Sequence, residues 1–314
     1  MGFKYSNAVI NFSIINACNC KCWFCCCGYA KAHEAPTKAK KLSLKDIKKA
    51  FVGTPPDEKL RRIIISGSGE SILNPECVEI ARFLKKQTKY LILISNGVLM
   101  KKETSARLIE AGVDEIRLSV TGATSEVWKV HQGCGYVKGG ADRVFERLLR
   151  NIRDLCENRD RINPEFMVGV NYILKPDTKD HLLYYLQTMR NIGVNFVELQ
   201  LFNEIGHTDN APKQFLIERT AERKRKRLPL CHAIGENMAT DIQTRPGDIW
   251  ACCLFNHPDL VVGNILENSI YDILRGEKFT SLYSELKSCG DNIPEICEFC
   301  MHRLSHVTYW EGRE

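Results

Sequence analysis

The chain has 314 residues, 44% of them hydrophobic and 26% charged, which suits one large domain or one domain with a smaller appendage. Its apolar runs have the length of strands and its N-terminus lacks the layout of a secretory signal, so we expect neither a transmembrane helix nor a leader. The net charge is +6, but residues 219–227 alone carry +5, and this concentration disfavours a nucleic-acid binder, which usually spreads positive charge over one face.

Through roughly the first two thirds of the chain, short β-branched runs alternate with amphipathic stretches. A helix is predicted to begin after Ser43, its N-cap, with Asp46 completing a capping-box-like pair. A second helix is predicted over about 102–111, and a third, containing 182–189, is predicted to end before Gly193. The predicted strands are 9–15, 62–66, 90–95, 114–120, 166–173 and 196–202.

Strands that alternate with helices form a parallel sheet with crossover connections. Six such units are too few for a complete eight-unit barrel, so we expect an α/β fold, a partial (β/α)6 TIM-like barrel, over residues 1–212. Ligands of these sheets bind at the C-terminal ends of the strands. The basic stretch 213–229 is expected to form a linker helix, and 230–314 a small cysteine-rich domain with a C-terminal tail.

Six cysteines crowd positions 18 to 27, directly after the first predicted strand. Among them only Cys18, Cys22 and Cys25 have the spacing CxxxCxxC. Three thiolates are soft ligands suited to iron–sulfur chemistry, and a cubane cluster held by three of them keeps one iron open, whereas structural zinc normally takes a fourth ligand. From the triplet alone, a zinc knuckle or an incidental cysteine-rich patch remains the alternative. Fifteen cysteines without a signal peptide also indicate metal ligation in a reducing, cytoplasmic compartment.

The triplet resembles the signature of the radical SAM enzymes, in which an aromatic residue, here Phe24, precedes the third cysteine. In that family the open iron binds the amino and carboxylate groups of S-adenosylmethionine. The reduced cluster then cleaves this cofactor to methionine and a 5′-deoxyadenosyl radical. The resemblance therefore implies one SAM-binding 4Fe–4S cluster, and an external one-electron reductant such as flavodoxin or ferredoxin.

Further turns at strand ends resemble family features. After the second predicted strand, a small-residue turn takes the places of the family's GGE motif, whose backbone binds the amino group of S-adenosylmethionine, although a plain glycine-rich turn is the alternative. By strand position, two polar residues are candidate contacts to the ribose or carboxylate, or simply satisfied strand-end residues. The residues concerned are Ser68, Gly69 and Glu70 in the turn, and Ser119 and Asn171 on the strands.

The cysteine-rich region resembles the auxiliary-cluster domains of radical SAM enzymes, called SPASM with two clusters and twitch with one. The matching pieces are Cys231, GDIWAC ending at Cys252, GNILENSI, and CEFC with its cysteines at 297 and 300. Because no cysteine follows Cys300, we expect the twitch form, one 4Fe–4S cluster held by Cys231, Cys252, Cys297 and Cys300. A four-cysteine zinc ribbon is the alternative. Spacing leaves open whether Cys252 or Cys253 ligates, and Cys289 is a substitute for Cys231.

If Cys253 does not ligate the cluster, its role would distinguish between the reactions that this family catalyses. In radical SAM epimerases a cysteine of this domain returns a hydrogen atom to a carbon radical, and this implies epimerisation of an amino sugar, a nucleoside or another small polar natural-product intermediate. The alternatives are dehydrogenation through the auxiliary cluster, modification of a ribosomal peptide, or a buried cysteine with no reaction role. A different class, a metal-binding RNA-interaction module, fits the barrel pattern poorly, so nucleic acid is not an expected partner. A membrane is not an expected partner either, because no apolar run has the length of a transmembrane helix.

Overall fold

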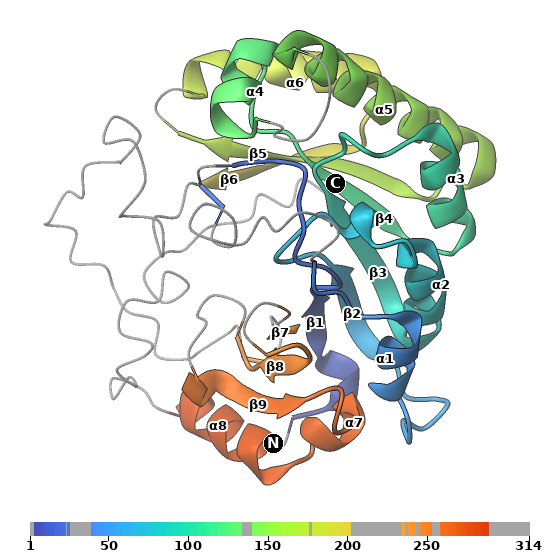
Figure 1. The fold of residues 1–314 in the computed structure, drawn as a ribbon, viewed down its shortest axis with the longest axis vertical. Helices are drawn as coiled ribbons and strands as arrows, with labels where there is room; N and C mark the ends of the chain where they lie inside the picture. Colours follow the sequence, from blue (N-terminus) through green and yellow to red (C-terminus); the bar gives the residue numbers. More distant parts are fainter. Residues whose placement is uncertain are drawn as a thin grey trace, which may run out of the picture.

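The computed structural model describes residues 3–22, 24–25, 39–133, 140–175, 178–201, 234–235, 238–240, 242, 245–252 and 258–288. Their strands form one sheet with the order β6-β5-β4-β3-β2-β1-β7-β8-β9 (Figure 1). The first six strands pair in chain order and are all parallel. They are β1 (Val9–Phe12), β2 (Leu60–Ile65), β3 (Thr88–Ser95), β4 (Glu115–Ser119), β5 (Met167–Leu174) and β6 (Phe196–Leu201).

The helices that connect these strands lie along the outer face of this curved sheet (Figure 1). A parallel pair cannot be joined by a tight turn, so each connection crosses over the same face and carries a helix. Consecutive strands with helices on one face form the predicted partial (β/α)6 barrel, and that prediction is confirmed. The helices are α1 (Leu44–Lys49), α2 (Cys77–Gln87), α3 (Lys102–Glu110), α4 (Ser125–His131), α5 (Ala141–Ile162) and α6 (Leu182–Ile192).

Local sequence signals account for the helix ends. The Ser43 side chain accepts the Asp46 N–H and the Asp46 carboxylate accepts the Ser43 N–H, so α1 begins with the predicted capping box. Gly193 ends α6 with a φ of 96°, a left-handed conformation that costs glycine little. The strands β2 to β6 match their predicted positions to within about two residues at each end. β1 ends at Phe12 rather than at residue 15, and the next N–H, that of Ser13, donates to Thr240 Oγ1.

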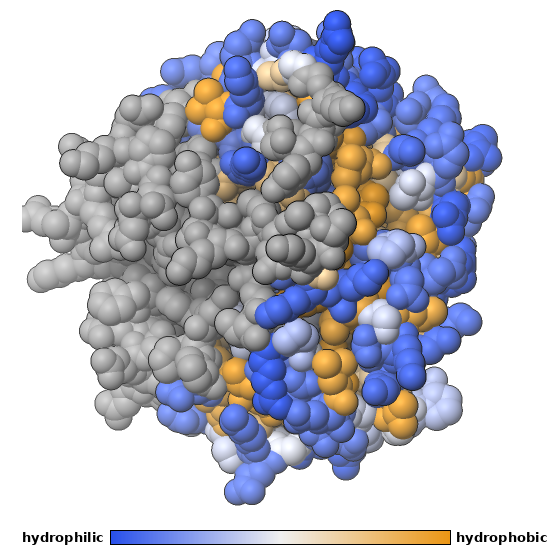
Figure 2. All heavy atoms as spheres, in the orientation of Figure 1, coloured by the Kyte–Doolittle hydropathy of each residue, from blue (hydrophilic) through white to orange (hydrophobic). Residues whose placement is uncertain are grey.

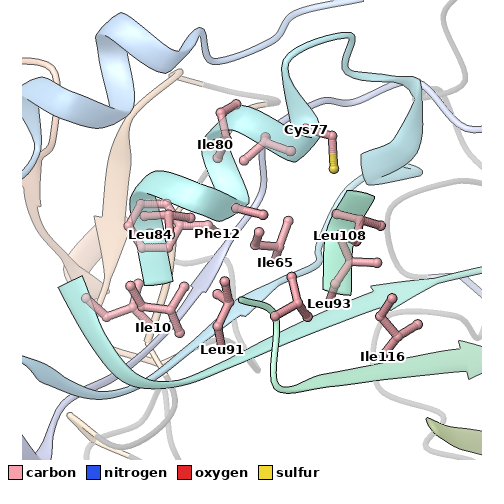
Figure 3. Close-up of a cluster of buried hydrophobic side chains, with 14 of the residues drawn as sticks. Ile10, Phe12, Ile65, Cys77, Ile80, Leu84, Leu91, Leu93, Leu108 and Ile116 are labelled. Carbon is pink, nitrogen blue, oxygen red and sulfur yellow. The ribbon is translucent and has the colours of Figure 1, made fainter. Parts of the chain in front are cut away.

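The core lies between the sheet and the outer helices (Figure 3). Alternate residues of a strand point to the same face of the sheet, so apolar residues at every second position give the sheet one apolar face. In Figure 3 these side chains interdigitate with those of α2 and α3, which the amphipathic pattern of both helices allows. The cluster is built from Ile10, Phe12, Ile65, Leu91, Leu93 and Ile116 on the strands and Cys77, Ile80, Leu84 and Leu108 on the helices.

Three strands of the C-terminal region extend the sheet beyond β1. β7 (Met238–Thr240) pairs parallel to β1, while β8 (Asp248–Trp250) and β9 (Val261–Asn264) follow as antiparallel neighbours. The helices α7 (Ile270–Ile273) and α8 (Glu277–Ser288) lie beside β9 (Figure 1). The predicted linker helix 213–229 lies outside the described residues, and the boundary between the two predicted domains stays a prediction.

The surface is predominantly polar over the described part of the face shown in Figure 2, with hydrophobic residues in scattered groups. Five large apolar side chains are exposed among the described residues: Val52, Val130, Leu183, Tyr184 and Leu199. Within the same described ranges, no helix is both long enough and apolar enough to cross a membrane.

Candidate active site

The cysteine triplet lies on the segment that leaves the C-terminal end of β1, at the edge of the sheet where parallel strands place their ligands. Two contacts hold this segment. Ala17 O accepts the Glu70 N–H at 2.8 Å from the turn after β2, and Ile15 forms a bridge with Lys41. Cys18 therefore follows directly after Ala17, whose backbone is hydrogen-bonded to the turn after β2.

Each of the three cysteines of the triplet lies partly buried. A turn joins two of them, because the Cys25 N–H donates to Cys22 O at 3.2 Å. Cys22 Sγ donates to the backbone oxygen of Gln132 at 3.8 Å, and Cys18 Sγ accepts the Cys20 N–H at 3.4 Å. Among the described residues, no group of three or more His, Cys, Asp or Glu side chains is gathered as a metal site.

Hydrogen bonds around Cys18 favour its thiolate. The pKa of this thiol is lowered from its usual value, chiefly by hydrogen bonding from Cys20, and Asn96 contributes in the same direction. Burial and the nearby Glu70 carboxylate oppose the shift. A thiolate is the form that ligates metal, so the surroundings of Cys18 suit the predicted use.

The turn after β2 requires its central glycine. A Cβ on Gly69 would lie 2.4 Å from Ile15 O and 2.5 Å from Ala17 O, and both of these are backbone atoms. The adjacent Ser68 N–H donates to Ser13 Oγ at 3.0 Å. The predicted small-residue turn thus packs its backbone against the segment that carries the cysteines.

The Glu70 carboxylate joins this turn to the end of β3. Oε1 accepts the Ser95 hydroxyl at 2.8 Å and the Ile72 N–H at 3.2 Å, while Oε2 accepts the Asn96 N–H at 2.7 Å. Burial raises the pKa of this carboxyl above its usual value, and the three hydrogen bonds oppose that rise. The side chain of Glu70 therefore positions two strand ends, a function that the motif comparison did not anticipate.

Ser119 and Asn171 are register partners on β4 and β5, close to the C-terminal edge. Tyr172 packs against Tyr185 of α6, so the alternation of a strand directs Asn171 to the inner face of the sheet. Asn171 is 6% exposed, and its Oδ1 has no hydrogen-bond partner within the described part of the chain. A buried acceptor without a donor is costly unless a ligand supplies one.

Gln132, directly after α4, connects these strand ends to the cysteine segment. Its side chain donates to Ser119 O at 2.8 Å and accepts the Thr121 N–H at 2.7 Å. Its backbone oxygen accepts from Lys21 N–H at 3.2 Å and from Cys22 Sγ at 3.8 Å. One residue thus brings the triplet beside the end of β4.

A buried cation lies next to the aromatic residue of the triplet. Lys175, one residue beyond β5, is 2% exposed, and its Nζ is 5.0 Å from the centre of the Phe24 ring. The same Nζ lies 2.7 Å from Nδ1 of His131, which is 1% exposed. Sequence reasoning missed Lys175 and the contacts that Gln132 makes, because no short motif marks either of them.

The predicted auxiliary ligands fall mostly outside the described residues. That is the case for Cys231, Cys297 and Cys300, and also for Cys253, the predicted hydrogen donor. Cys252 is described and is largely buried just beyond β8. The assignment of ligands in this region stays a prediction.

A parallel α/β barrel with soft ligands beyond its first strand defines a class of enzyme that binds a metal cluster at the C-terminal sheet edge. The family model of the radical SAM superfamily matches residues 12–189, and that of the SPASM iron–sulfur cluster-binding domain matches 231–301. The chain belongs to the radical SAM superfamily and carries a SPASM/twitch-type domain.

Relatives and solved structures agree with this placement. A probable GTP 3′,8-cyclase from Methanococcus maripaludis (strain C5) is 26% identical over 230 residues, 70% of each chain. One from Saccharolobus islandicus (strain Y.N.15.51) is 21% identical over 301 residues, 88% of this chain and 90% of that one. Streptococcus suis SuiB bound to S-adenosylmethionine has a TM-score of 0.64 at 15% identity, covering 89% of this chain and 68% of SuiB. Native anSMEcpe with bound AdoMet has a TM-score of 0.62 at 13% identity, covering 94% and 87%.

The family's cofactors, S-adenosylmethionine and 4Fe–4S clusters, are therefore those of this chain. The described residues fit them in two respects. Three cysteine thiols supply soft ligands at the spacing of the family, and the buried Asn171 Oδ1 offers an acceptor to a donor group of a bound molecule.

Proposed function

We propose that Cys18, Cys22 and Cys25 hold the SAM-binding cluster of a radical enzyme that acts on a substrate C–H bond. The observation that carries this is the connection through Gln132, which joins the triplet segment to the end of β4 beside Asn171. Soft ligands and an unsatisfied buried acceptor then lie at one edge of the sheet. When bound, the reduced cluster and S-adenosylmethionine supply hydrogen-atom abstraction.

The remaining predicted residues would bind and orient the cofactor. The tight packing of Gly69 against Ile15 O and Ala17 O holds the turn beside the cysteine segment, where its backbone would contact the amino group of S-adenosylmethionine. The Ser68 and Glu70 backbone would complete that contact. Ser119 and Asn171 would bind its ribose or carboxylate, and the Phe24 ring would shield the cluster.

For the fate of the substrate we propose epimerisation of a carbon centre in an amino sugar, nucleoside or similar small polar intermediate. The Cys253 S–H bond would break as a new C–H bond forms on the opposite face. One electron and one proton then restore the thiol, and the electron would come from the external reductant, flavodoxin or ferredoxin. The auxiliary cluster on Cys231, Cys252, Cys297 and Cys300 would lie beside it. The fifteen cysteines support a reducing, cytoplasmic setting for this chemistry.

The comparisons favour a second candidate, cyclisation of a nucleotide, because relatives over 88% of the chain are named probable GTP 3′,8-cyclases. Two-electron dehydrogenation through the auxiliary cluster, or action on a peptide, as the complex of SuiB with the precursor peptide SuiA suggests, are further outcomes of the same test.

The test is an anaerobic assay of substrate-dependent 5′-deoxyadenosine, run with the reconstituted enzyme against a metabolite panel that includes GTP. The product is then made in deuterated water. One deuterium at an inverted carbon supports epimerisation, whereas a loss of two hydrogens supports dehydrogenation and an unlabelled ring-closed isomer supports cyclisation. Under epimerisation, Cys253→Ala still forms 5′-deoxyadenosine but no product, while the matched buried-cysteine control Cys156→Ala retains both. Absence of 5′-deoxyadenosine with every substrate contradicts the proposal.

A further inference from the structure

Asn96, in the turn after β3, contacts the cysteine segment directly. Its Nδ2 donates to Cys18 Sγ at 3.8 Å and to Asn19 Oδ1 at 2.8 Å. The side chain is only 9% exposed, so water competes little for these bonds. Asn96 is therefore a side-chain donor from another strand end to a cysteine of the triplet.

The orientation of the Asn96 amide is fixed by its surroundings. Oδ1 accepts the Val98 N–H at 3.0 Å, and a flipped amide would turn its own N–H groups toward that donor. The Asn96 N–H donates to Glu70 Oε2 at 2.7 Å, and the neighbouring Ser95 hydroxyl donates to Oε1. The backbone and the amide of Asn96 are thus both held, and this arrangement directs the Nδ2 group toward Cys18.

Hydrogen bonds to a cluster thiolate change the reduction potential of the cluster. Reduction adds negative charge that spreads onto the sulfur ligands, and an N–H donor stabilises that charge more in the reduced state than in the oxidised state. Removal of such a donor therefore lowers the potential. Cys18 also accepts the Cys20 N–H at 3.4 Å, so Asn96 is the donor to this sulfur that comes from another strand end, and its loss would remove that contact.

We propose that Asn96 is a positioning residue that holds Cys18 and raises the reduction potential of the cluster it ligates. The inference rests on the proposed function, in which Cys18 is a cluster ligand. It assigns to the turn after β3 an electronic effect on the cluster.

Asn151 of α5 supplies a matched control. It is 8% exposed, and its Nδ2 donates to Gly97 O at 2.8 Å and Val98 O at 3.1 Å, so it supports the same turn without a described contact to a cysteine. If loosening of the turn were enough to change the cluster, Asn151→Ala would do so as well. If the N–H to sulfur contact matters, only the Asn96 variants will.

The experiment is a redox titration of the reconstituted holoenzyme, monitored by electron paramagnetic resonance through the signal that changes on addition of S-adenosylmethionine. At the wild-type midpoint we expect Asn96→Ala to lower the ratio of reduced to oxidised cluster about three- to tenfold, where tenfold corresponds to about 59 mV for one electron. Asn151→Ala should stay within about twofold. Asn96→Asp keeps the volume but adds negative charge, so it should shift at least as far as Asn96→Ala and carries the test if the alanine variant loads poorly.

An Asn96→Ala or Asn96→Asp cluster within twofold of wild type overturns the inference, and so does an equal shift in Asn151→Ala. The same spectroscopic signal, measured in Cys18→Ala together with iron and sulfide content, separates failure of this inference from failure of the proposed function. If Cys18→Ala retains the SAM-responsive signal at wild-type amounts, then Cys18 is not a ligand and the proposed function fails. If that signal is lost but the Asn96 variants do not shift, only the inference fails.

Discussion

Replacement of Gly69 by alanine tests how the turn after β2 supports the cysteine segment. The added Cβ would lie 2.4 Å from Ile15 O and 2.5 Å from Ala17 O, where real Cβ contacts essentially never fall below 3.0 Å. Neither oxygen belongs to a flexible side chain, so a strand end must move. That movement also breaks the hydrogen bond from the Glu70 N–H to Ala17 O, which is 2.8 Å long.

The expected cost follows from these two terms. Overpacking of a buried site costs about 1–3 kcal/mol, and loss of the hydrogen bond adds about 1 kcal/mol. We therefore expect the free energy of unfolding to fall by about 2–4 kcal/mol. Because Ala17 precedes Cys18, the reconstituted variant should also retain less iron and bind S-adenosylmethionine more weakly.

Anaerobic urea unfolding and iron analysis measure both effects. Gly140→Ala is the matched control, since Gly140 has an ordinary φ of −64° and an added Cβ would have no atom of the described residues within 4 Å. Its stability should stay within about 0.5 kcal/mol of wild type. If Gly69→Ala proves as stable as Gly140→Ala and holds the same iron, the packing account of the turn is refuted.

Three further changes test other parts of the site. Burial raises the pKa of Glu70, so the protonated side chain stabilises the folded state. This contribution to the free energy of unfolding is complete below the unfolded pKa of about 4.3 and is lost as the pH rises through the folded pKa. Glu70→Gln should remove this loss of stability with pH, and urea unfolding between pH 5 and 8 would detect the difference. Asn171→Ala should raise the Kd for S-adenosylmethionine about tenfold by calorimetry, and should destabilise the cofactor-free protein less than Asn74→Ala, whose amide is fully bonded. Gln132→Ala removes two side-chain hydrogen bonds, one buried and one partly buried, that hold Gln132 at the end of β4. It should lower stability by about 2–4 kcal/mol in urea unfolding and slow 5′-deoxyadenosine formation, because the Gln132 backbone oxygen that contacts the triplet segment would be less well held; an unchanged rate would contradict that link.

The sequence predicted the barrel because its signals are local. Periodicity placed all six parallel strands, and a serine three residues before an aspartate placed the start of α1. It could not predict that β7 pairs with β1, since that contact joins residues such as Ile10 and Met238, far apart in the chain, and depends on how the whole sheet closes.

The same distinction applies to the site. Spacing identified the cysteine triplet, and strand position identified Asn171, whose buried oxygen the structure leaves without a described partner. The supporting contacts were missed, because the link from Asn96 to Cys18 spans 78 residues and that from Lys175 to His131 spans 44. Side-chain amides and cations at such distances leave no periodic trace in a sequence.

The central claim is that Cys18, Cys22 and Cys25 hold the cluster that cleaves S-adenosylmethionine. The most direct measurement is formation of 5′-deoxyadenosine by the anaerobically reconstituted protein with dithionite, compared between Cys22→Ala and Cys156→Ala. Cys156 is a buried cysteine of α5 outside the triplet, and burial raises its pKa to about 11. We predict that Cys156→Ala forms 5′-deoxyadenosine as wild type does and that Cys22→Ala forms none. Equal formation by both variants would contradict the account.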